Sequence, residues 1–262
     1  MISVIIIIII VLSVWYLVKW TATDLDYIYK GKIIYFGHRG ERCAAPENTI
    51  TSYLSAVEKG LAAIELDVRI AKDDKLVCSH NIDLERETLG IGFIDELTYA
   101  ELQSIKAGKD FPEKDQGRIP LLEEVLKTLS TDILLNIEIK SDYLTDIRAA
   151  KVLANMIKQD KIKHKILVSS FNPVVVRYIK LYCKNVPTGY IYEHAKHFKG
   201  VFIAKPDCLH PAAEFIDDEL IEFCRKHKMH INTWTVNNVY ARNWLIEKRV
   251  TGIITDNPKL LT

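Results

Sequence analysis

The sequence is poor in cysteine, and its five thiols are widely scattered. No two of them are separated by only two residues, which argues against a zinc or redox motif. Unpaired thiols fit a reducing compartment, and we expect them to be free and mostly buried. They are Cys43, Cys78, Cys183, Cys208 and Cys224.

The sequence also has no marked excess of positive or negative charge: its formal net charge is +1, and no long basic run occurs. Binding to nucleic acid depends strongly on positive charge, so no nucleic-acid partner is expected. No glycine-rich phosphate loop follows the first predicted strand, which argues against an open doubly wound sheet. The 262 residues instead suit one α/β domain with a short N-terminal appendage.

That appendage is the apolar run from Ile2 to Val18, which is interrupted only by Ser13. At about 1.5 Å per residue, a helix of this length just reaches the hydrocarbon thickness of a thin bilayer. No basic residue precedes it, so we predict an uncleaved transmembrane helix at 1–20 rather than a signal peptide. A linker at 21–31 and a barrel domain at 32–262 would follow. The positive-inside rule weakly favours a single-pass membrane protein with a cytoplasmic domain, because three lysines follow the run: Lys19, Lys30 and Lys32.

The soluble part is organised around His38-Arg39-Gly40, which ends a short apolar strand. Three later apolar runs also carry charged residues, at 64–67, 76–80 and 137–140. Charges inside buried strands are costly unless they are paired or hold a metal. Four such stretches therefore indicate a functional site.

The order of predicted elements favours a TIM barrel, an eight-stranded parallel (β/α)8 fold. Expected strands are 33–37, 63–68, 133–140, 166–171, 188–192, 208–210, 231–236 and 252–255, mostly separated by helices. Residues 69–75 are too few for a helical crossover, so 76–80 should return antiparallel to the second strand. That hairpin would bring His80 close to Glu65 and Asp67. The polar, glycine-punctuated stretch at about 81–118 is predicted to be an insertion after strand two.

Three carboxylates, Glu65, Asp67 and Glu138, fall at expected strand ends. Oxygen ligands without thiolate favour Mg²⁺ or Ca²⁺ over zinc. The alternative is that each carboxylate only pairs with a buried cation. His38 and His80 could serve as general base and general acid near neutral pH. Positive charge at the same rim suits a phosphate group, and it comes from Arg39 and Lys140.

Taken together, the motifs resemble the glycerophosphodiester phosphodiesterase family over about residues 33–260. The stretches that carry the resemblance are His38-Arg39-Gly40, Pro46-Glu47-Asn48-Thr49, Glu65-Leu66-Asp67-Val68, His80, Arg118-Ile119-Pro120-Leu121, Glu138-Ile139-Lys140, Thr233-Trp234-Thr235-Val236-Asn237 and Ile254-Thr255-Asp256-Asn257-Pro258.

The resemblance implies a TIM barrel with a small insertion after strand two, and hydrolysis of glycerophosphodiesters to sn-glycerol 3-phosphate and an alcohol. It also implies roles for individual residues: a divalent metal on Glu65, Asp67 and Glu138; acid–base catalysis by His38 and His80; phosphate binding by Arg39 and Lys140; and support of the first loop by Glu47 and Asn48. One departure is Asn81, where the family commonly has aspartate after the second histidine. A neutral amide would orient His80 with less charge support.

Two other functions remain open from the sequence. Lysophospholipase D activity would suit an anchored enzyme, with Phe171 and Trp234 accommodating part of the substrate at the rim. A catalytically inactive barrel that binds lipid head groups would be marked by loss of a central residue, and none of the central residues is missing.

Overall fold

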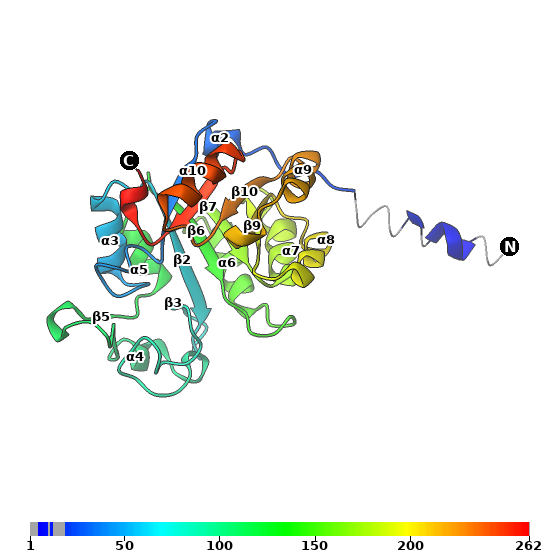
Figure 1. The fold of residues 1–262 in the computed structure, drawn as a ribbon. Coiled ribbons are helices and arrows are strands. Elements are labelled where there is room, and N and C mark those ends of the chain that lie inside the picture. Colours follow the sequence, from blue (N-terminus) through cyan, green and yellow to red (C-terminus); the bar gives the residue numbers. More distant parts are fainter. Residues whose placement is uncertain (1–4, 10, 13–18, 262) are drawn as a thin grey trace.

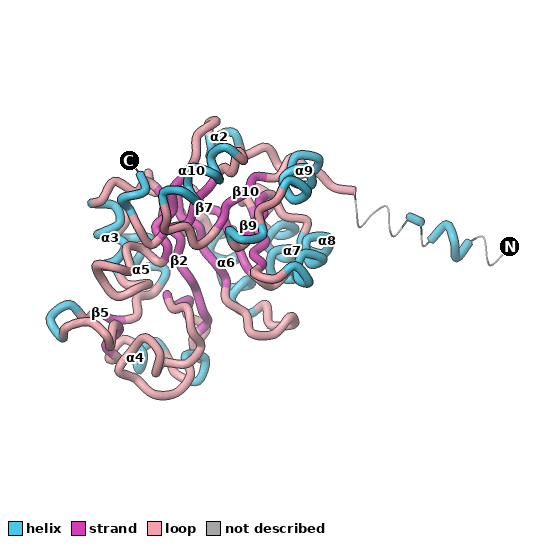
Figure 2. Tube along the Cα trace, viewed as in Figure 1, coloured by secondary structure: helices cyan, strands magenta, loops and turns pink. Residues whose placement is uncertain are grey.

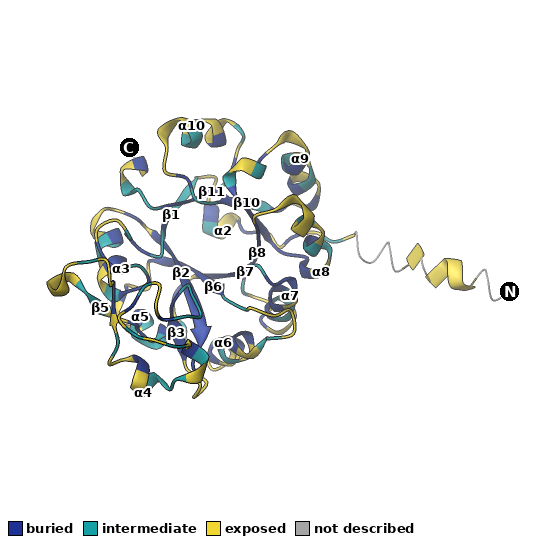
Figure 3. Cartoon of the chain, turned by 60° about the horizontal axis from the view of Figure 1, so that its bottom comes forward, coloured by how far each residue is buried: buried dark blue, intermediate teal, exposed yellow. Residues whose placement is uncertain are grey.

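The computed structural model describes residues 5–9, 11–12 and 19–261, and its centre is a closed eight-stranded parallel barrel. Figure 1 shows the barrel from the side, with its helices around it. The strands run in the order β1-β11-β10-β9-β8-β7-β6-β2, and β1 pairs with β2 to close the ring (Figure 3). Their bounds are β1 Ile34–His38, β2 Ala63–Ile70, β6 Leu134–Ile139, β7 Ile166–Ser170, β8 Thr188–Tyr192, β9 Cys208–Pro211, β10 His230–Thr233 and β11 Gly252–Thr255. The predicted TIM barrel is therefore confirmed.

The hairpin predicted after the second strand is also present. β3 (Leu76–Cys78) pairs antiparallel with β2, with Val68 opposite Cys78. β3 lies outside the ring as an added edge strand. The hairpin turns the chain back toward the carboxyl end of the barrel, which places the residues after Cys78 beside the end of β2.

Helices surround the barrel and bury the outer face of its strands. The side chains of each strand alternate between this outer face and the barrel interior. Every residue of β2 is buried: its apolar side chains Leu66 and Val68 belong to the core shared with the helices, and the alternate positions face the barrel interior. The helices are α3 Ile50–Glu58, α5 Leu122–Thr128, α6 Arg148–Lys158, α7 Pro173–Tyr182, α8 Val201–Ala204, α9 Asp218–His227 and α10 Val239–Glu247. Side-chain oxygens cap the amino ends of several of them: Thr49, Asn172, Asp217 and Asn238.

The segment between β3 and α5 forms a small subdomain at one side of the barrel, mostly as loop (Figure 2). It contains α4 Tyr99–Leu102 and a two-stranded sheet of β4 Lys106–Ala107 and β5 Gly117–Arg118. It has a hydrophobic cluster of its own, in which Leu84, Ile94 and Leu102 are fully buried. The segment covers part of the barrel mouth. Short 3-10 turns occur at Ile94–Glu96, Glu113–Asp115, Ala195–Gly200, Ala213–Phe215 and Pro258–Leu261.

The stretch expected as a linker packs against the barrel. Its helix α2 (Asp26–Tyr29) buries Tyr29 with Leu25, Leu167 and Cys208. The hydroxyl of Tyr29 donates to Asn232 Oδ1 at 2.9 Å inside the barrel. Residues 25–29 therefore cover the amino-terminal end of the barrel, opposite the end where His38 lies.

The expected single-pass membrane helix needs correction. Much of 1–20, namely 1–4, 10 and 13–18, lies outside the described residues. In the part of the chain that the structure does describe, no helix combines the length and apolar character needed to cross a bilayer. A helix that crosses the hydrocarbon core needs about 20 predominantly apolar residues, and no helix among the described residues meets that requirement. The predicted single-pass membrane protein is wrong by this criterion.

Candidate active site

The pairing register brings the acidic residues together at the carboxyl end of the barrel. His38 at the end of β1 is the register partner of Glu65 in β2, and Asp67 is the partner of Glu138 in β6. Glu65 and Asp67 are two residues apart, so both face the barrel interior. The ends of three neighbouring strands therefore meet here: β2 and β6 supply the acidic cluster, and β1 places His38 beside it.

Glu65, Asp67 and Glu138 each offer a carboxylate oxygen, and these oxygens lie within 4.8 Å of one another. The side chains are buried, with residue exposures of 3%, 1% and 7%. Burial raises the pKa of Glu65, and the negative charges of Asp67 and Glu138 raise it further. A divalent cation would neutralise the repulsion between these buried carboxylates. Their oxygen atoms are ligands of the kind that Mg²⁺ and Ca²⁺ prefer. The cluster could thus hold one such ion.

Two cations border the acidic cluster. Lys140, two residues beyond Glu138, hydrogen-bonds to Glu138, and its Nζ lies 3.0 Å from Asp67 Oδ1. Arg39 Nε lies 3.2 Å from Asp67 Oδ2, and the Arg39 backbone N–H donates to Glu65 at 3.0 Å. The left-handed backbone of Arg39, with φ of 56°, turns this N–H toward the cluster. Carboxylate–cation pairing, the alternative to a metal site, is therefore present in the same group of residues.

The loop after β1 holds Asp67 through Asn48. The Asn48 amide donates to Asp67 Oδ2 at 2.8 Å, and its oxygen accepts the backbone N–H of Asp67 at 3.1 Å. Glu47 pairs with Arg39 at 2.5 Å and with Arg42 at 2.9 Å. The two residues expected to support this loop thus contact a carboxylate and a cation of the site.

His38 is held by a carboxylate from the last strand of the barrel. Its Nδ1 lies 2.7 Å from Asp256 Oδ1, and Asn237 donates to the other oxygen of Asp256 at 2.7 Å. Burial alone would raise the pKa of Asp256, but the hydrogen bond and charge of His38 lower it. With Nδ1 engaged, Nε2 is the ring nitrogen of His38 available to a substrate.

His80 has a different environment. Its Nδ1 lies 3.0 Å from the side-chain oxygen of Asn81. Burial and the positive charge of Lys140 lower the pKa of His80 to about 4, although the charge of Asp67 opposes this shift. His80 is therefore a neutral imidazole at neutral pH and can accept a proton.

Two aromatic side chains complete the wall of the site. Phe171 and Trp234 meet edge to face, with ring centroids 5.6 Å apart, and Lys140 Nζ lies 5.6 Å from the centre of the Phe171 ring. The indole N–H of Trp234 donates to the backbone oxygen of His210 at 3.0 Å, which fixes the ring. The rings provide an apolar surface beside the charged cluster.

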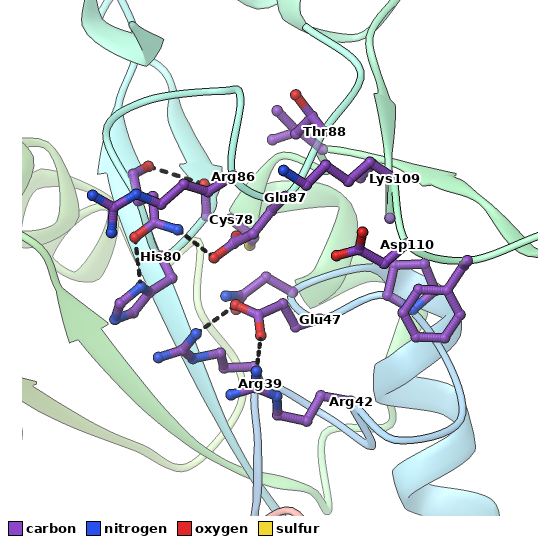
Figure 4. A pocket seen from close by; sticks show the side chains of 18 residues that line it. Arg39, Arg42, Glu47, Cys78, His80, Arg86, Glu87, Thr88, Lys109 and Asp110 are labelled. Carbon is purple, nitrogen blue, oxygen red and sulfur yellow. Dashed lines mark hydrogen bonds and ion pairs between the residues drawn. The ribbon is translucent and has the colours of Figure 1, made fainter.

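Most of the predicted residues surround one cavity of about 240 Å³: His38, Arg39, Glu65, His80, Glu138, Lys140, Phe171 and Trp234. A second cavity, of about 390 Å³, adjoins it between the first loop and the insertion, and Glu47 and Asn48 lie on its wall (Figure 4). Asp67 lies beneath both. The structure therefore brings all the predicted site residues together.

Two residues at the site had no role assigned from the sequence. Asp256 belongs to one of the stretches that carry the family resemblance, but no role was assigned to it, and its contact with His38 spans 218 positions in the chain. Glu87 lies in the polar insertion and contacts Asn81, the residue that departs from the usual aspartate. Neither contact leaves a local pattern in the sequence.

A (β/α)8 barrel whose carboxyl end joins acidic, cationic and imidazole side chains defines a barrel enzyme suited to phosphate esters. Residues 38–260 match the model of the glycerophosphoryl diester phosphodiesterase family. The chain belongs to this family and is thus a phosphoric diester hydrolase by class.

Two relatives with related names match this chain along most of its length. A glycerophosphodiester phosphodiesterase of Caldanaerobacter subterraneus subsp. tengcongensis is 35% identical over 234 residues, which are 88% of this chain and 96% of that protein. A glycerophosphodiester phosphodiesterase of Bacillus subtilis is 29% identical over 250 residues, or 87% and 85%. Among solved structures, the Thermotoga maritima glycerophosphodiester phosphodiesterase is 29% identical, with a TM-score of 0.70 over 87% of this chain and 96% of that one.

The fold is also similar to that of an Oleispira antarctica phosphodiesterase solved with the product sn-glycerol-3-phosphate. The TM-score is 0.81 over 89% of this chain and 97% of that one, at 24% identity.

Proposed function

We propose that this chain hydrolyses glycerophosphodiesters to sn-glycerol 3-phosphate and an alcohol, by acid–base catalysis that depends on a divalent metal. The observation that carries the proposal is the convergence of the acidic cluster, two cations and two imidazoles on one cavity at the carboxyl end of the barrel. The names of the relatives support the same substrate class. We take 32–262 as the catalytic domain, with the insertion at about 81–118 covering one side of the site.

The charged groups would bind the phosphodiester. Arg39 and Lys140 are the placed cations for its non-bridging oxygens. Glu65, Asp67 and Glu138 would hold Mg²⁺ or Ca²⁺, an ion that, when bound, polarises the phosphoryl group. Glu47 and Asn48 would keep the first loop in place: Glu47 holds the guanidinium of Arg39, and Asn48 fixes the carboxylate of Asp67.

The two histidines would transfer the protons. One imidazole accepts a proton from the attacking hydroxyl, either water or a hydroxyl of the substrate glycerol, while a new bond forms to phosphorus. The bond from phosphorus to the leaving alcohol breaks, and the other imidazole gives a proton to that oxygen. Where the glycerol hydroxyl attacks, this step leaves a cyclic phosphate, and water then opens it to sn-glycerol 3-phosphate with proton transfer by the same two imidazoles. His38, paired with Asp256, and His80, beside Asn81, each keep Nε2 for this exchange. Phe171 and Trp234 would pack against the apolar edge of the substrate.

The test is release of sn-glycerol 3-phosphate from glycerophosphocholine by the purified full chain, with added Mg²⁺ or Ca²⁺ and with EDTA. We expect chelator-sensitive release, and a loss of at least 100-fold in His38→Ala and in His80→Ala, because general acid–base catalysis contributes about 10²–10⁴-fold. His197→Ala is the matched control, since His197 is exposed and lines neither cavity.

Near-normal turnover in both active-site variants would contradict the assigned roles. Lysophosphatidylcholine should be run beside the diester. Release from the lysophospholipid alone would reject the proposed substrate class while keeping the hydrolytic chemistry.

A further inference from the structure

Glu87 lines the 390 Å³ cavity together with His80, proposed to transfer a proton, and Arg39, proposed to bind the phosphate. It comes from the insertion, whereas His80 follows the β2–β3 hairpin and Arg39 follows β1. In Figure 4 the carboxyl group of Glu87 lies between Glu47 and the loop that carries His80. The mechanism above gives this half-buried acid no task.

The contact between Glu87 and Asn81 determines how the Asn81 amide is turned. The Asn81 amide nitrogen donates to Glu87 Oε1 at 2.5 Å, which leaves the amide oxygen toward His80 Nδ1, 3.0 Å away. An amide has nearly the same shape in either orientation, so its partners decide which end faces the ring. A carboxyl oxygen at this position selects the orientation in which the oxygen faces the imidazole.

The orientation of the amide in turn selects the tautomer of His80. An oxygen that faces Nδ1 accepts a hydrogen bond, so Nδ1 carries the proton and Nε2 is the free base. With the amide reversed, its N–H₂ would face Nδ1, and the neutral ring would carry its proton on Nε2. The two tautomers present opposite proton-transfer properties to the substrate.

Glu87 also has a partner on the side away from Asn81. It shares a hydrogen bond with Glu47, which pairs with Arg39. Burial and the negative charge of Glu47 raise the pKa of Glu87 to about 8, so one proton is shared between the two carboxyl groups near neutral pH. A continuous series of hydrogen bonds thus runs from His80 to Arg39.

We propose that Glu87 is a positioning residue which, through Asn81, fixes the orientation and tautomer of His80 in the reaction. The inference rests on the proposed function, because it needs His80 to transfer a proton. Glu87 touches neither the acidic cluster nor the substrate in this scheme. Its effect on His80 passes through the Asn81 amide.

The first test compares Glu87→Ala and Glu87→Gln with Glu85→Gln on glycerophosphocholine hydrolysis. Glu87→Ala removes the acceptor of the Asn81 amide, so we expect kcat to fall about tenfold, a fraction of the full acid–base contribution, with KM within twofold. Glu87→Gln can offer its amide oxygen to Asn81 and should stay within about threefold of the parent. Glu85, on the same loop but exposed, is the matched control, and Glu85→Gln should change nothing.

The second test exchanges the amide and the acid. Asn81→Asp alone adds a third carboxyl group beside Glu87 and Glu47, which share only one proton, and the resulting repulsion should lower kcat as Glu87→Ala does. In the double variant Asn81→Asp/Glu87→Gln, an acceptor again faces His80 and a donor again joins the two side chains. We expect kcat to return to within about threefold of the parent. Recovery in the double variant supports the proposal, and no recovery overturns it.

An activity-independent measurement separates this inference from the proposed function. The ¹⁵N chemical shifts of the His80 ring report its tautomer directly, and we expect Nδ1–H in the parent and a mixture in Glu87→Ala. An unchanged tautomer in Glu87→Ala overturns the positioning role even if the enzyme is active. If instead His80→Ala keeps full turnover, the proposed function fails, whatever the tautomer.

Discussion

The pair formed by Asp256 and His38 allows a quantitative prediction for Asp256→Asn. The carboxylate accepts from His38 Nδ1 at 2.7 Å, and the side chains of His38 and Asp256 are 12% and 20% exposed. The amide substitution keeps the size of the side chain but removes its charge. It can also turn an N–H₂ group toward Nδ1, which would favour the wrong tautomer of His38.

The expected loss follows from the strength of this contact. Hydrogen bonds to charged groups contribute about 1.5–3 kcal/mol. Because Asp256 is one-fifth exposed, solvent weakens the interaction, and the lower part of that range applies. A loss of about 1.5–2 kcal/mol in the transition state corresponds to roughly a 10- to 30-fold lower kcat. KM should change little, because Asp256 does not contact the substrate in the proposed scheme.

The assay is steady-state hydrolysis of glycerophosphocholine at saturating divalent metal, with circular dichroism to verify folding. Asp218→Asn is the control, since Asp218 is an exposed carboxylate of α9 that pairs only with Lys248 among the described residues. The reasoning is refuted if Asp256→Asn keeps kcat within threefold of the parent, or if the whole effect is in KM.

Three further substitutions have predictable results. Lys140→Met leaves the buried carboxylates of Asp67 and Glu138 without the lysine that pairs with them. Activity should be lost, and the free energy of unfolding in urea should fall by about 3–5 kcal/mol. Unchanged stability would contradict the pairing. Asp207→Asn, at the opposite end of the barrel, breaks the buried pair with Lys180 and should cost a similar amount while kcat stays normal. Burial raises the pKa of Asp207, but Lys180 lowers it below its usual value. The stability that the ion pair contributes is therefore present above the unfolded-state pKa of Asp207 and is lost as the pH falls through its folded-state pKa. The parent should lose more stability in acid than the Asp207→Asn variant. Gly252→Ala would put a Cβ 2.0 Å from Asn232 Oδ1, and thermal unfolding should show a loss of about 1–3 kcal/mol, whereas an unchanged midpoint would mean that this contact relaxes freely.

The central part of the site could be predicted from the sequence because strand geometry is local. Two carboxylates two residues apart in a strand must share a face, and a connection as short as 69–75 can only turn back as a hairpin. Those two facts bring Glu65, Asp67 and His80 together, as the structure shows. The repeated alternation of strands and helices then implies a barrel, whose carboxyl end collects His38 and Glu138.

Contacts that depend on closure of the ring could not be predicted in this way. Asp256 meets His38 because β11 pairs with β1, and nothing near either residue specifies that partner. Glu87 lies in a segment with little regular structure, so its distance from Asn81 depends on the packing of the insertion core. At the N-terminus, apolar composition favoured a membrane span, but no helix among the described residues has the length and apolar character that a span needs.

The charges at the site explain why pairing and metal binding need not be alternatives. Glu65, Asp67 and Glu138, when ionised, face Arg39 and Lys140, and three carboxylates against two cations leave one net negative charge. Glu47 and Asp256 do not alter this balance where Arg42 offsets the charge of Glu47 and a protonated His38 offsets that of Asp256. A divalent cation would convert the excess to one positive charge, which a singly charged phosphodiester then neutralises. The cations can thus stabilise the buried carboxylates before substrate binds, and a divalent ion would leave the site with the positive charge that a phosphodiester needs.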